Sequence, residues 1–247
     1  MSVTRRGGWA ALLGAVLLAA CTMTPPKPDY AAIVAAPDRS AADRQNDKRR
    51  APVKMLAFIG VMPGWKIADM GAGAGYSTEL LARATGPTGI VYAQNPPDMY
   101  PPAKKALVAR AKTPAMKNVV LVSRRYDDPI PPGVHDLDLI TFFYAYHDVT
   151  YMKVDRRKMD AALLAALKPG GYLVIADYNS LPGMGTMVAH TLHRIDEDFL
   201  RREIEAAGFK FVKEGFFLRN PNDPRNMPIF HPKIPIDIFV LKFQKPA

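Results

Sequence analysis

The sequence predicts an α/β fold in which helices cover both faces of a mostly parallel sheet. Two observations carry this prediction. From Lys66 onwards, short apolar runs alternate with amphipathic segments, which indicates strands alternating with helices. The first apolar run continues through Gly71, Gly73 and Gly75 into an amphipathic segment, as a strand does when it turns tightly into a helix. The 247 residues, 49% of them hydrophobic, suit one large domain.

The first 20 residues have the parts of a secretory signal peptide. Arg5 and Arg6 form a short positive region, and an apolar region follows from Trp9 to Ala20. About a dozen apolar residues are too few to cross a bilayer, which takes roughly 20. We therefore assign residues 1–20 to a signal peptide.

The sequence LAAC, from Leu18 to Cys21, resembles the lipobox of bacterial lipoproteins, whose cysteine becomes the lipidated first residue of the mature chain. Cys21 is the only cysteine, so it cannot form an intrachain disulfide. The resemblance implies a bacterial protein of the cell envelope, on the periplasmic face and anchored in the membrane through lipidated Cys21. An incidental cysteine behind an ordinary signal peptide is the alternative. Residues 21–39 are rich in proline and alanine and are expected to form a tether; the domain then covers residues 40–247.

The charge of the chain bears on its partners. Without the two arginines of residues 1–20, 31 basic and 23 acidic residues leave a net charge of +8. Such a charge favours contact with anionic membrane surfaces or acidic ligands. The basic residues are dispersed and not interleaved with aromatic ones, so we expect no nucleic-acid partner.

Capping residues and apolar patterns predict the elements after residue 40. Ser40 can cap one helix, and Pro52 can begin the next. A helix over residues 154–167 ends at the KPGG of residues 168–171, and Asp196 caps a helix over residues 197–207. The last two strands are separated by only a loop, which favours antiparallel neighbours. The expected strands are residues 66–70, 89–95, 118–123, 137–146, 172–178, 209–218 and 236–243.

The glycine spacing discriminates between nucleotide ligands. A dinucleotide-binding loop has its third glycine three residues after its second, but here Tyr76 occupies that position and the third glycine is Gly75. A nicotinamide oxidoreductase is therefore disfavoured. A glycine turn that serves only strand and helix packing is the structural alternative.

The sequence DMGAGAG, residues 69–75, resembles motif I of the class I S-adenosylmethionine-dependent methyltransferases, and KPGG before the fifth strand and the final antiparallel pair are also typical of that family. The resemblance implies a Rossmann-like three-layer sandwich with strand order 3-2-1-4-5-7-6 and an antiparallel last strand. It also implies S-adenosylmethionine as cofactor, with the carboxylate of Asp69 acting on its ammonium group directly or through water. The candidate cofactor-binding residues are Asp69, Gly71, Ala72, Gly73, Tyr76, Asn95 and Asp127.

The end of the second strand departs from the family pattern. The family usually has an acid there that accepts both ribose hydroxyls, whereas this chain has Gln94 and Asn95. The amide of Asn95 can accept one hydrogen bond and donate another, so an uncharged ribose contact is expected. Asp98 is the alternative ribose ligand. Asp127, next to Asp128 after the third strand, is expected near the adenine, or else is a turn residue.

The methyl acceptor is expected at the carboxyl ends of the fourth and fifth strands, because ligands bind there in such sheets. The fourth strand leads to Tyr144, His147 and Asp148, and we expect these to be the catalytic residues. Proton removal from an acceptor suits a histidine near neutral pH, so His147 is the candidate general base. A histidine that only caps the strand end is the alternative.

Two long connections follow and are candidates for substrate contacts. Residues 178–196 contain His193 and Arg194, and residues 218–233 contain Arg219; these three are the candidate substrate-binding residues. His190 and His193 share a helical spacing, but no matching third ligand is evident in the sequence, so we expect no metal site.

The sequence therefore predicts an S-adenosylmethionine-dependent methyltransferase with a small or envelope-associated acceptor. A non-catalytic, methyltransferase-like binding lipoprotein of the envelope is the alternative, because the acid of the second strand is missing and the chain is expected to be exported. The acceptor, the element methylated and the oligomeric state are left open.

Overall fold

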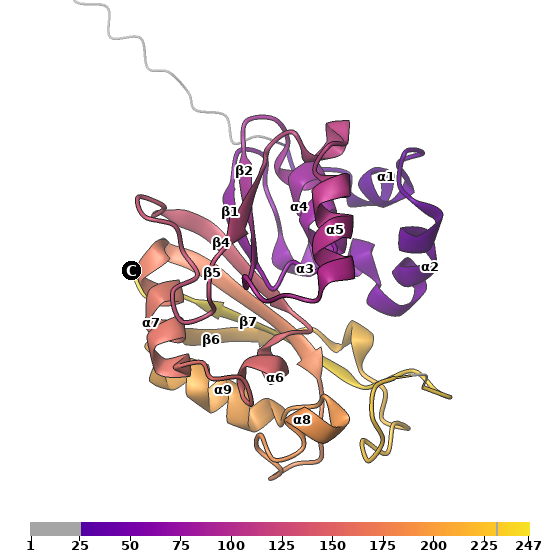
Figure 1. The fold of residues 1–247 in the computed structure, drawn as a ribbon, viewed down its shortest axis with the longest axis vertical. Helices are drawn as coiled ribbons and strands as arrows, with labels where there is room; N and C mark the ends of the chain where they lie inside the picture. The colour runs from indigo at the N-terminus through magenta and orange to yellow at the C-terminus, as the bar shows by residue number, and fades with distance from the viewer. Residues whose placement is uncertain (1–25, 231) are drawn as a thin grey trace, which may run out of the picture.

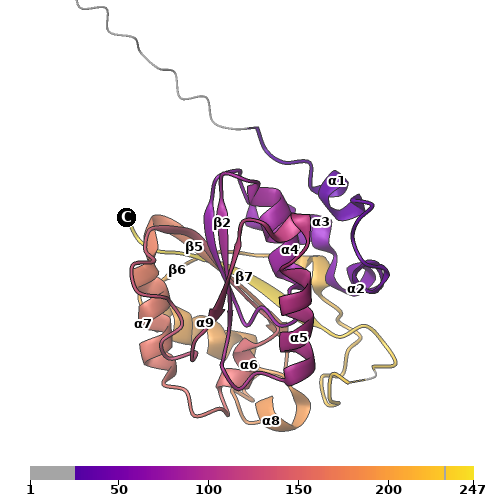
Figure 2. The same ribbon diagram turned by 45° about the horizontal axis from the view of Figure 1, so that its top comes forward.

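The computed structural model describes residues 26–230 and 232–247, so the expected signal peptide and Cys21 lie outside the described residues. Figures 1 and 2 show a central sheet with helices on both sides. The strands are β1 (Lys66–Met70), β2 (Ile90–Asn95), β3 (Val119–Ser123), β4 (Leu137–Phe143), β5 (Leu167–Tyr178), β6 (Lys210–Glu214) and β7 (Ile238–Gln244). The helices are α1 (Tyr30–Ala35), α2 (Ala41–Arg50), α3 (Pro52–Ile59), α4 (Tyr76–Thr85), α5 (Pro101–Arg110), α6 (Tyr146–Val149), α7 (Arg156–Ala166), α8 (Ala189–Leu192) and α9 (Glu197–Ala206), with 3-10 turns η1 (Pro114–Met116) and η2 (Phe216–Leu218).

The sheet has the predicted order, β3-β2-β1-β4-β5-β7-β6. Strands β1 to β5 pair in parallel, and β7 is antiparallel to both β5 and β6. Strands β1 and β4 are neighbours in the middle of the sheet, and the strands that follow each of them lie toward opposite edges. A crevice therefore lies between the carboxyl ends of β1 and β4. The prediction of a seven-stranded, mostly parallel sheet is confirmed.

Two apolar cores lie on opposite faces of this sheet. On β4, Ile140 and Phe142 face one core while Leu139 and Phe143 face the other, as the period of two along a strand requires. Helices α7 and α9 cover the first core, and α1, α3 and α4 cover the second. The result is the expected three-layer sandwich.

The predicted helix caps are present. The hydroxyl of Ser40 accepts from the Asp43 N–H at the start of α2, and the carboxylate of Asp196 accepts from two N–H groups at the start of α9. The predicted helix ends one residue early, at Ala166, and β5 begins at Leu167 rather than at Tyr172, so that strand includes the KPGG segment.

The packed domain begins earlier than the expected boundary at residue 40. Asp29 caps α1, and the Tyr30 hydroxyl donates to the Val61 carbonyl at 2.7 Å. Arg39 is buried and forms a two-bond ion pair with Asp47. Residues 30–39 therefore belong to the domain rather than to a tether. The burial of Tyr30 and the ion pair of Arg39 offset the conformational entropy that this segment loses when it is ordered. In the part of the chain that the structure describes, no helix is both long and apolar enough to cross a membrane.

Candidate active site

Two cavities lie at the carboxyl ends of the central strands and share Gly71, Gly73 and Tyr144 in their walls. The central cavity, of about 470 Å³, is lined by Gly71, Gly73, Asn95, Pro96, Asp98, Met99, Tyr100, Tyr126, Tyr144, Ala145, Asp148, Tyr151, Met152 and His193. The loop cavity, of about 270 Å³, is lined by Asp43, Asn46, Arg50, Asp69, Gly71, Ala72, Gly73, Ala74, Tyr76, Ser77, Arg110, Phe143 and Tyr144. The glycine loop therefore separates two hollows that one elongated ligand could occupy together.

The three glycines of the loop all have positive φ, +60° at Gly71 and Gly73 and +86° at Gly75, which side chains rarely adopt. Their surroundings differ. A Cβ on Gly71 would lie 2.9 Å from the Cβ of Ala145, and one on Gly75 would lie 2.7 Å from Cδ1 of Leu107. A Cβ on Gly73 would meet nothing closer than 3.9 Å. Gly71 and Gly75 thus permit close packing, whereas Gly73 keeps space open beside the cavities.

Asp69 is the penultimate residue of β1, beneath the loop, and is buried. The hydroxyls of Thr78 and Thr141 donate to its two carboxylate oxygens at 2.6 and 2.7 Å. Burial raises the pKa of Asp69 to about 6, although the two hydroxyls oppose that rise. Asp69 lies in the wall of the loop cavity, where its negative charge would favour a cation.

Asn95 and Gln94 hold the loop itself. The Asn95 side chain accepts from the Gly73 N–H at 2.9 Å and donates to the Gly73 carbonyl at 3.1 Å. Gln94 accepts from the Gly71 N–H and donates to the Arg124 carbonyl. The expected ribose contact of Asn95 therefore competes with a backbone role that occupies both ends of its amide. Asp98 is exposed on the wall of the central cavity and is free of that role.

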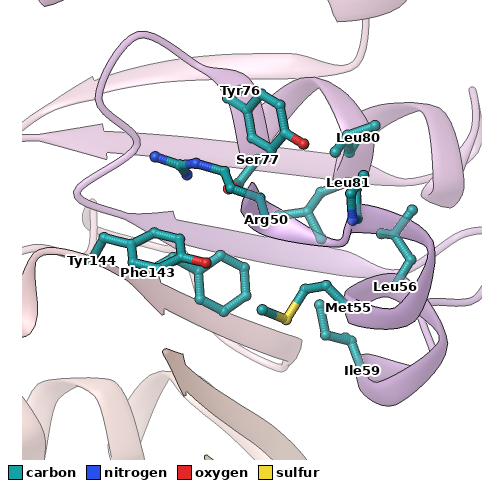
Figure 3. Close-up of a pocket in the computed structure, with 11 residues that line it drawn as sticks. Arg50, Met55, Leu56, Ile59, Tyr76, Ser77, Leu80, Leu81, Phe143 and Tyr144 are labelled. Carbon is teal, nitrogen blue, oxygen red and sulfur yellow. The ribbon is translucent and has the colours of Figure 1, made fainter. Parts of the chain in front are cut away.

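Arg50, at the end of α2, lies between two aromatic rings. Figure 3 shows its side chain between Tyr76 and Tyr144. Its guanidinium carbon is 5.0 Å from the centre of the Tyr76 ring and 4.5 Å from that of Tyr144. Arg50 forms no ion pair within residues 26–230 and 232–247, whereas Arg110 in the same wall is paired with Asp43. The loop cavity thus holds one stacked cation available to an anion.

Tyr76 and Tyr144 frame this site but are held differently. The Tyr76 hydroxyl donates to Asp47 at 2.6 Å, which ties α4 to α2. Tyr144 has a positive φ of 59°, and its ring lines both cavities. Its buried hydroxyl has no hydrogen-bond partner among the described residues. An apolar hollow of about 20 Å³ beside these rings is lined in part by Met55, Leu56 and Ile59 of α3 (Figure 3).

His147 is buried at the end of the sheet, with 2% of its side chain exposed. Its Nδ1 lies 2.8 Å from Oδ1 of Asp177, and its backbone N–H donates to the other oxygen of that carboxylate. Burial alone would lower the pKa of His147, but Asp177 and Asp148 offset burial and raise that pKa to about 10. A histidine that keeps its proton at neutral pH is a poor general base, so the structure weakens the role expected for His147.

Asp148 and His193 reach the central cavity in front of His147. A quarter of the His193 side chain is exposed, and its ring lies edge-on to Phe230 at 4.8 Å. Burial and the charge of His147 lower the pKa of His193. The hydrogen bond from His147 holds the pKa of Asp148 below its usual value although burial opposes this. The Tyr151 hydroxyl also donates to Asp148.

The other three predicted site residues are engaged in ion pairs. Both oxygens of Asp127 accept from Arg125, and Asp127 is not among the residues of either cavity wall. Arg194 is buried against Asp223 and the carbonyls of Asn179 and Met227. Arg219 is paired with three acids, Glu197, Glu214 and Asp237. The arginines thus hold the two long connections together.

Sequence reasoning did not assign roles to Arg50, Tyr151 or Asp177, and it placed Asp98 only as an alternative. Asp177 could have been found, because an acid at the end of a central strand is itself a signal. Arg50 could not, because only packing brings α2 over the glycine loop. His147, Asp148 and His193 also meet at a spacing suited to a metal ion, whereas the expectation of no metal site rested on His190 and His193.

Comparisons with known proteins bear on the fold of the chain. No protein-family model matches the chain. It is 25% identical over 185 residues to the ubiquinone/menaquinone biosynthesis C-methyltransferase UbiE of Shewanella halifaxensis. The aligned region covers 64% of this chain and 71% of that protein.

Solved structures show the same fold. A crystal structure of an S-adenosylmethionine-dependent methyltransferase from Aquifex aeolicus superposes with a TM-score of 0.61 at 19% identity, over 89% of this chain and all of that one. An arsenic(III) S-adenosylmethionine methyltransferase from Chlamydomonas reinhardtii has a TM-score of 0.57 at 13% identity, over 90% and 74% of the two chains. An O-methyltransferase from Thermotoga maritima has 0.54 at 16%, over 83% and 70%. The chain therefore has the class I methyltransferase fold, which these proteins use for different acceptors.

Proposed function

We propose that this protein is an S-adenosylmethionine-dependent methyltransferase for a small or envelope-associated acceptor. The observation that carries the proposal is the pair of opposite charges in the loop cavity. Arg50 is stacked and has no ion-pair partner among the described residues, and Asp69 is a buried carboxylate in the same wall. The amino-acid part of the cofactor is a zwitterion, so its carboxylate fits Arg50 and its ammonium fits Asp69.

The central cavity then receives the rest of the cofactor and the acceptor. Open space at Gly73 lets the ligand lie against the loop, and Asp98 can accept from the ribose hydroxyls. The acceptor binds toward Asp148, Tyr151 and His193. In the reaction, an acceptor lone pair forms a bond to the methyl carbon while the carbon–sulfur bond breaks, and its electron pair goes to sulfur. A proton on the acceptor atom leaves to water, and the chain contributes the alignment of acceptor and methyl group.

Calorimetry with the demethylated product, S-adenosylhomocysteine, tests the cofactor site. We expect Arg50→Ala to weaken binding about tenfold, the size of one charge-assisted contact. Arg49→Ala is the matched control, because Arg49 is exposed and contacts Asn46 instead. Failure of the wild-type protein to bind would refute the proposal.

A labelled-methyl assay with envelope extracts tests catalysis. We expect transfer by the wild-type protein and loss of transfer in Gly73→Asp, whose side chain would enter the cofactor site. Binding of the cofactor without transfer to any extract component would instead support the non-catalytic binding lipoprotein.

We also propose that the protein is anchored in the cell envelope through lipidated Cys21, as the LAAC sequence indicates. Labelling with a radioactive fatty acid and membrane fractionation test this placement. We expect Cys21→Ser to lose both the label and membrane association. Lipid retained by the Cys21→Ser protein would show that the anchor is elsewhere.

A further inference from the structure

Three potential metal ligands converge on one point in the wall of the central cavity. Nε2 of His147 lies 3.2 Å from Nδ1 of His193 and 3.1 Å from Oδ1 of Asp148. The third side of this triangle, from His193 to Asp148, is 3.4 Å. The chain separation between the ligands, 46 residues from His147 to His193, explains why the sequence alone did not suggest the site.

These separations match those around a bound metal ion. Nitrogen and oxygen ligands lie about 2.0–2.2 Å from divalent transition metals. At that radius, neighbouring ligands in tetrahedral or octahedral sites are separated by roughly 2.9–3.5 Å. All three sides of the triangle fall in this range. One ion could therefore bind all three atoms with little movement of the side chains.

The surrounding hydrogen bonds orient the ligands for this task. Asp177 lies 2.8 Å from Nδ1 of His147, and because a carboxylate accepts, Nδ1 donates to it. Nε2 is therefore the nitrogen that faces Asp148 and His193 and that a metal ion would take. A carboxylate behind a ligating histidine is a common arrangement in metal sites. The Tyr151 hydroxyl donates to Asp148 and restrains the third ligand. A divalent ion at this point would interact with two carboxylates, with Asp148 directly and with Asp177 through His147.

We propose that His147, Asp148 and His193 bind one divalent transition-metal ion. Two nitrogens and one carboxylate oxygen favour Zn²⁺, Co²⁺ or Ni²⁺ over Mg²⁺ and Ca²⁺, which prefer oxygen ligands. His193 and Asp148 are partly exposed to the central cavity, so the open coordination positions face it.

The ion's use in catalysis rests on the proposed methyltransferase function. It would take an acceptor oxygen at an open position and lower the pKa of the acceptor hydroxyl. The hydroxyl proton would leave to water, and the electron pair kept by oxygen would form the bond to the methyl carbon. The carbon–sulfur bond would break with its electron pair on sulfur. A metal ion here would thus suit an acceptor with a hydroxyl group.

Metal titration of the purified, untagged protein after dialysis against a chelator tests the site. We expect one equivalent of Zn²⁺ by calorimetry and a visible absorption band on addition of Co²⁺. His193→Ala and Asp148→Asn should each weaken Zn²⁺ binding at least tenfold, and Asp177→Asn should weaken it about 10–100-fold through His147. His190→Ala is the matched control, because this exposed histidine is three residues from His193 and outside the triangle.

The outcomes separate the two proposals. No Zn²⁺ binding by the wild-type protein, or unchanged binding in a correctly folded His193→Ala or Asp148→Asn protein, would overturn the metal site. Circular dichroism melting checks the fold of each variant. Zn²⁺ binding without S-adenosylhomocysteine binding would support the site and refute the methyltransferase function. Binding of S-adenosylhomocysteine without binding of Zn²⁺ would support the methyltransferase function and overturn the metal site.

Discussion

Single side chains decide how the glycine loop is held and what charge it presents. Asn95 spans the backbone of Gly73 with one donated and one accepted bond. Asp69 lies under the same loop with both oxygens occupied by threonine hydroxyls. The first residue controls the shape of the loop, and the second controls the charge beneath it.

Asn95→Asp separates a structural role from a ribose contact. A carboxylate cannot donate to the Gly73 carbonyl, so two oxygens would face each other across a 3.1 Å contact. We expect the free energy of unfolding to fall by about 1–2 kcal/mol and the affinity for S-adenosylhomocysteine to fall with it. Chemical denaturation and calorimetry measure the two effects. Asp98→Asn, the control, should weaken binding without changing stability. Tighter binding by Asn95→Asp at unchanged stability would show that position 95 contacts the ribose.

Asp69 makes cofactor affinity depend on pH. Its pKa is about 6 because of burial, so the free protein gains a proton there as pH falls and loses the charge that faces the ammonium group. We expect affinity for S-adenosylhomocysteine to fall about tenfold from pH 7 to pH 5, and Asp69→Asn to bind weakly at both. Calorimetry at each pH measures this. Adenosine, which lacks the amino-acid part, is the control and should bind equally at both pH values. An equal loss for adenosine would assign the effect to another group.

At the scale of elements, the turn from β1 into α4 combines packing with ligand access. Gly75 lies against α5, close to Leu107 and Arg110, whereas Gly73 faces open space. Helix α2 completes the site from the other side, because Asp47 accepts from Tyr76 and Arg50 stacks on Tyr76. The loop is thus shaped by elements on both sides.

Alanine at Gly73 and at Gly75 should have different consequences. Both have positive φ, which costs about 1–2 kcal/mol for a residue with a side chain. At Gly75 the added Cβ also collides with Leu107 at 2.7 Å and with Arg110 at 2.9 Å, so we expect a further loss of about 1–3 kcal/mol. At Gly73 we expect the smaller loss of stability but weaker cofactor-product binding. Thermal melting and calorimetry distinguish the two. Equal stability losses would show that strain rather than packing dominates.

At the scale of the whole molecule, the two faces of the sheet have different roles. The face under α1, α3 and α4 supports the cofactor loop, and the face under α7 and α9 contains a cluster of polar side chains. There the single hydroxyl of Tyr146 lies 3.0 Å from Asp160 and 3.1 Å from Glu203. One hydroxyl proton cannot satisfy two carboxylates, so a proton on Asp160 completes the group.

Because of Asp160, the free energy of unfolding should decrease as the pH rises. Burial, together with the charge of Glu203, raises its pKa from 3.8 to about 8. Between these values the folded protein holds a proton that the unfolded chain has lost, so stability falls as pH rises through this window. We expect Asp160→Asn to remove much of that slope and to be more stable at pH 8 by about 1–3 kcal/mol. Denaturation at pH 5 and pH 8 measures it. Asp136→Asn, at an exposed position, is the control, and a slope unchanged by Asp160→Asn would refute the assignment.

Local patterns determined much of this protein. The strand order came with the motif resemblance, and the caps at Ser40 and Asp196 follow from single residues beside amphipathic runs. The spacing of Gly71, Gly73 and Gly75 likewise favours a sulfonium nucleoside over a dinucleotide. These features depend on residues that are neighbours in the sequence, so they can be predicted from the sequence alone.

Only the tertiary structure decided which side chains meet. Arg50 reaches the loop because α2 packs over it, and His193 joins His147 across 46 residues of chain because two strand ends and a long connection converge. Arg194 and Arg219 are of a residue type that often binds anionic ligands. In this structure they instead form ion pairs with Asp223 and Glu197, which lie far from them in the sequence. The physical reason is that ion pairs and ligand sets depend on distances in space, which packing sets and local sequence does not record.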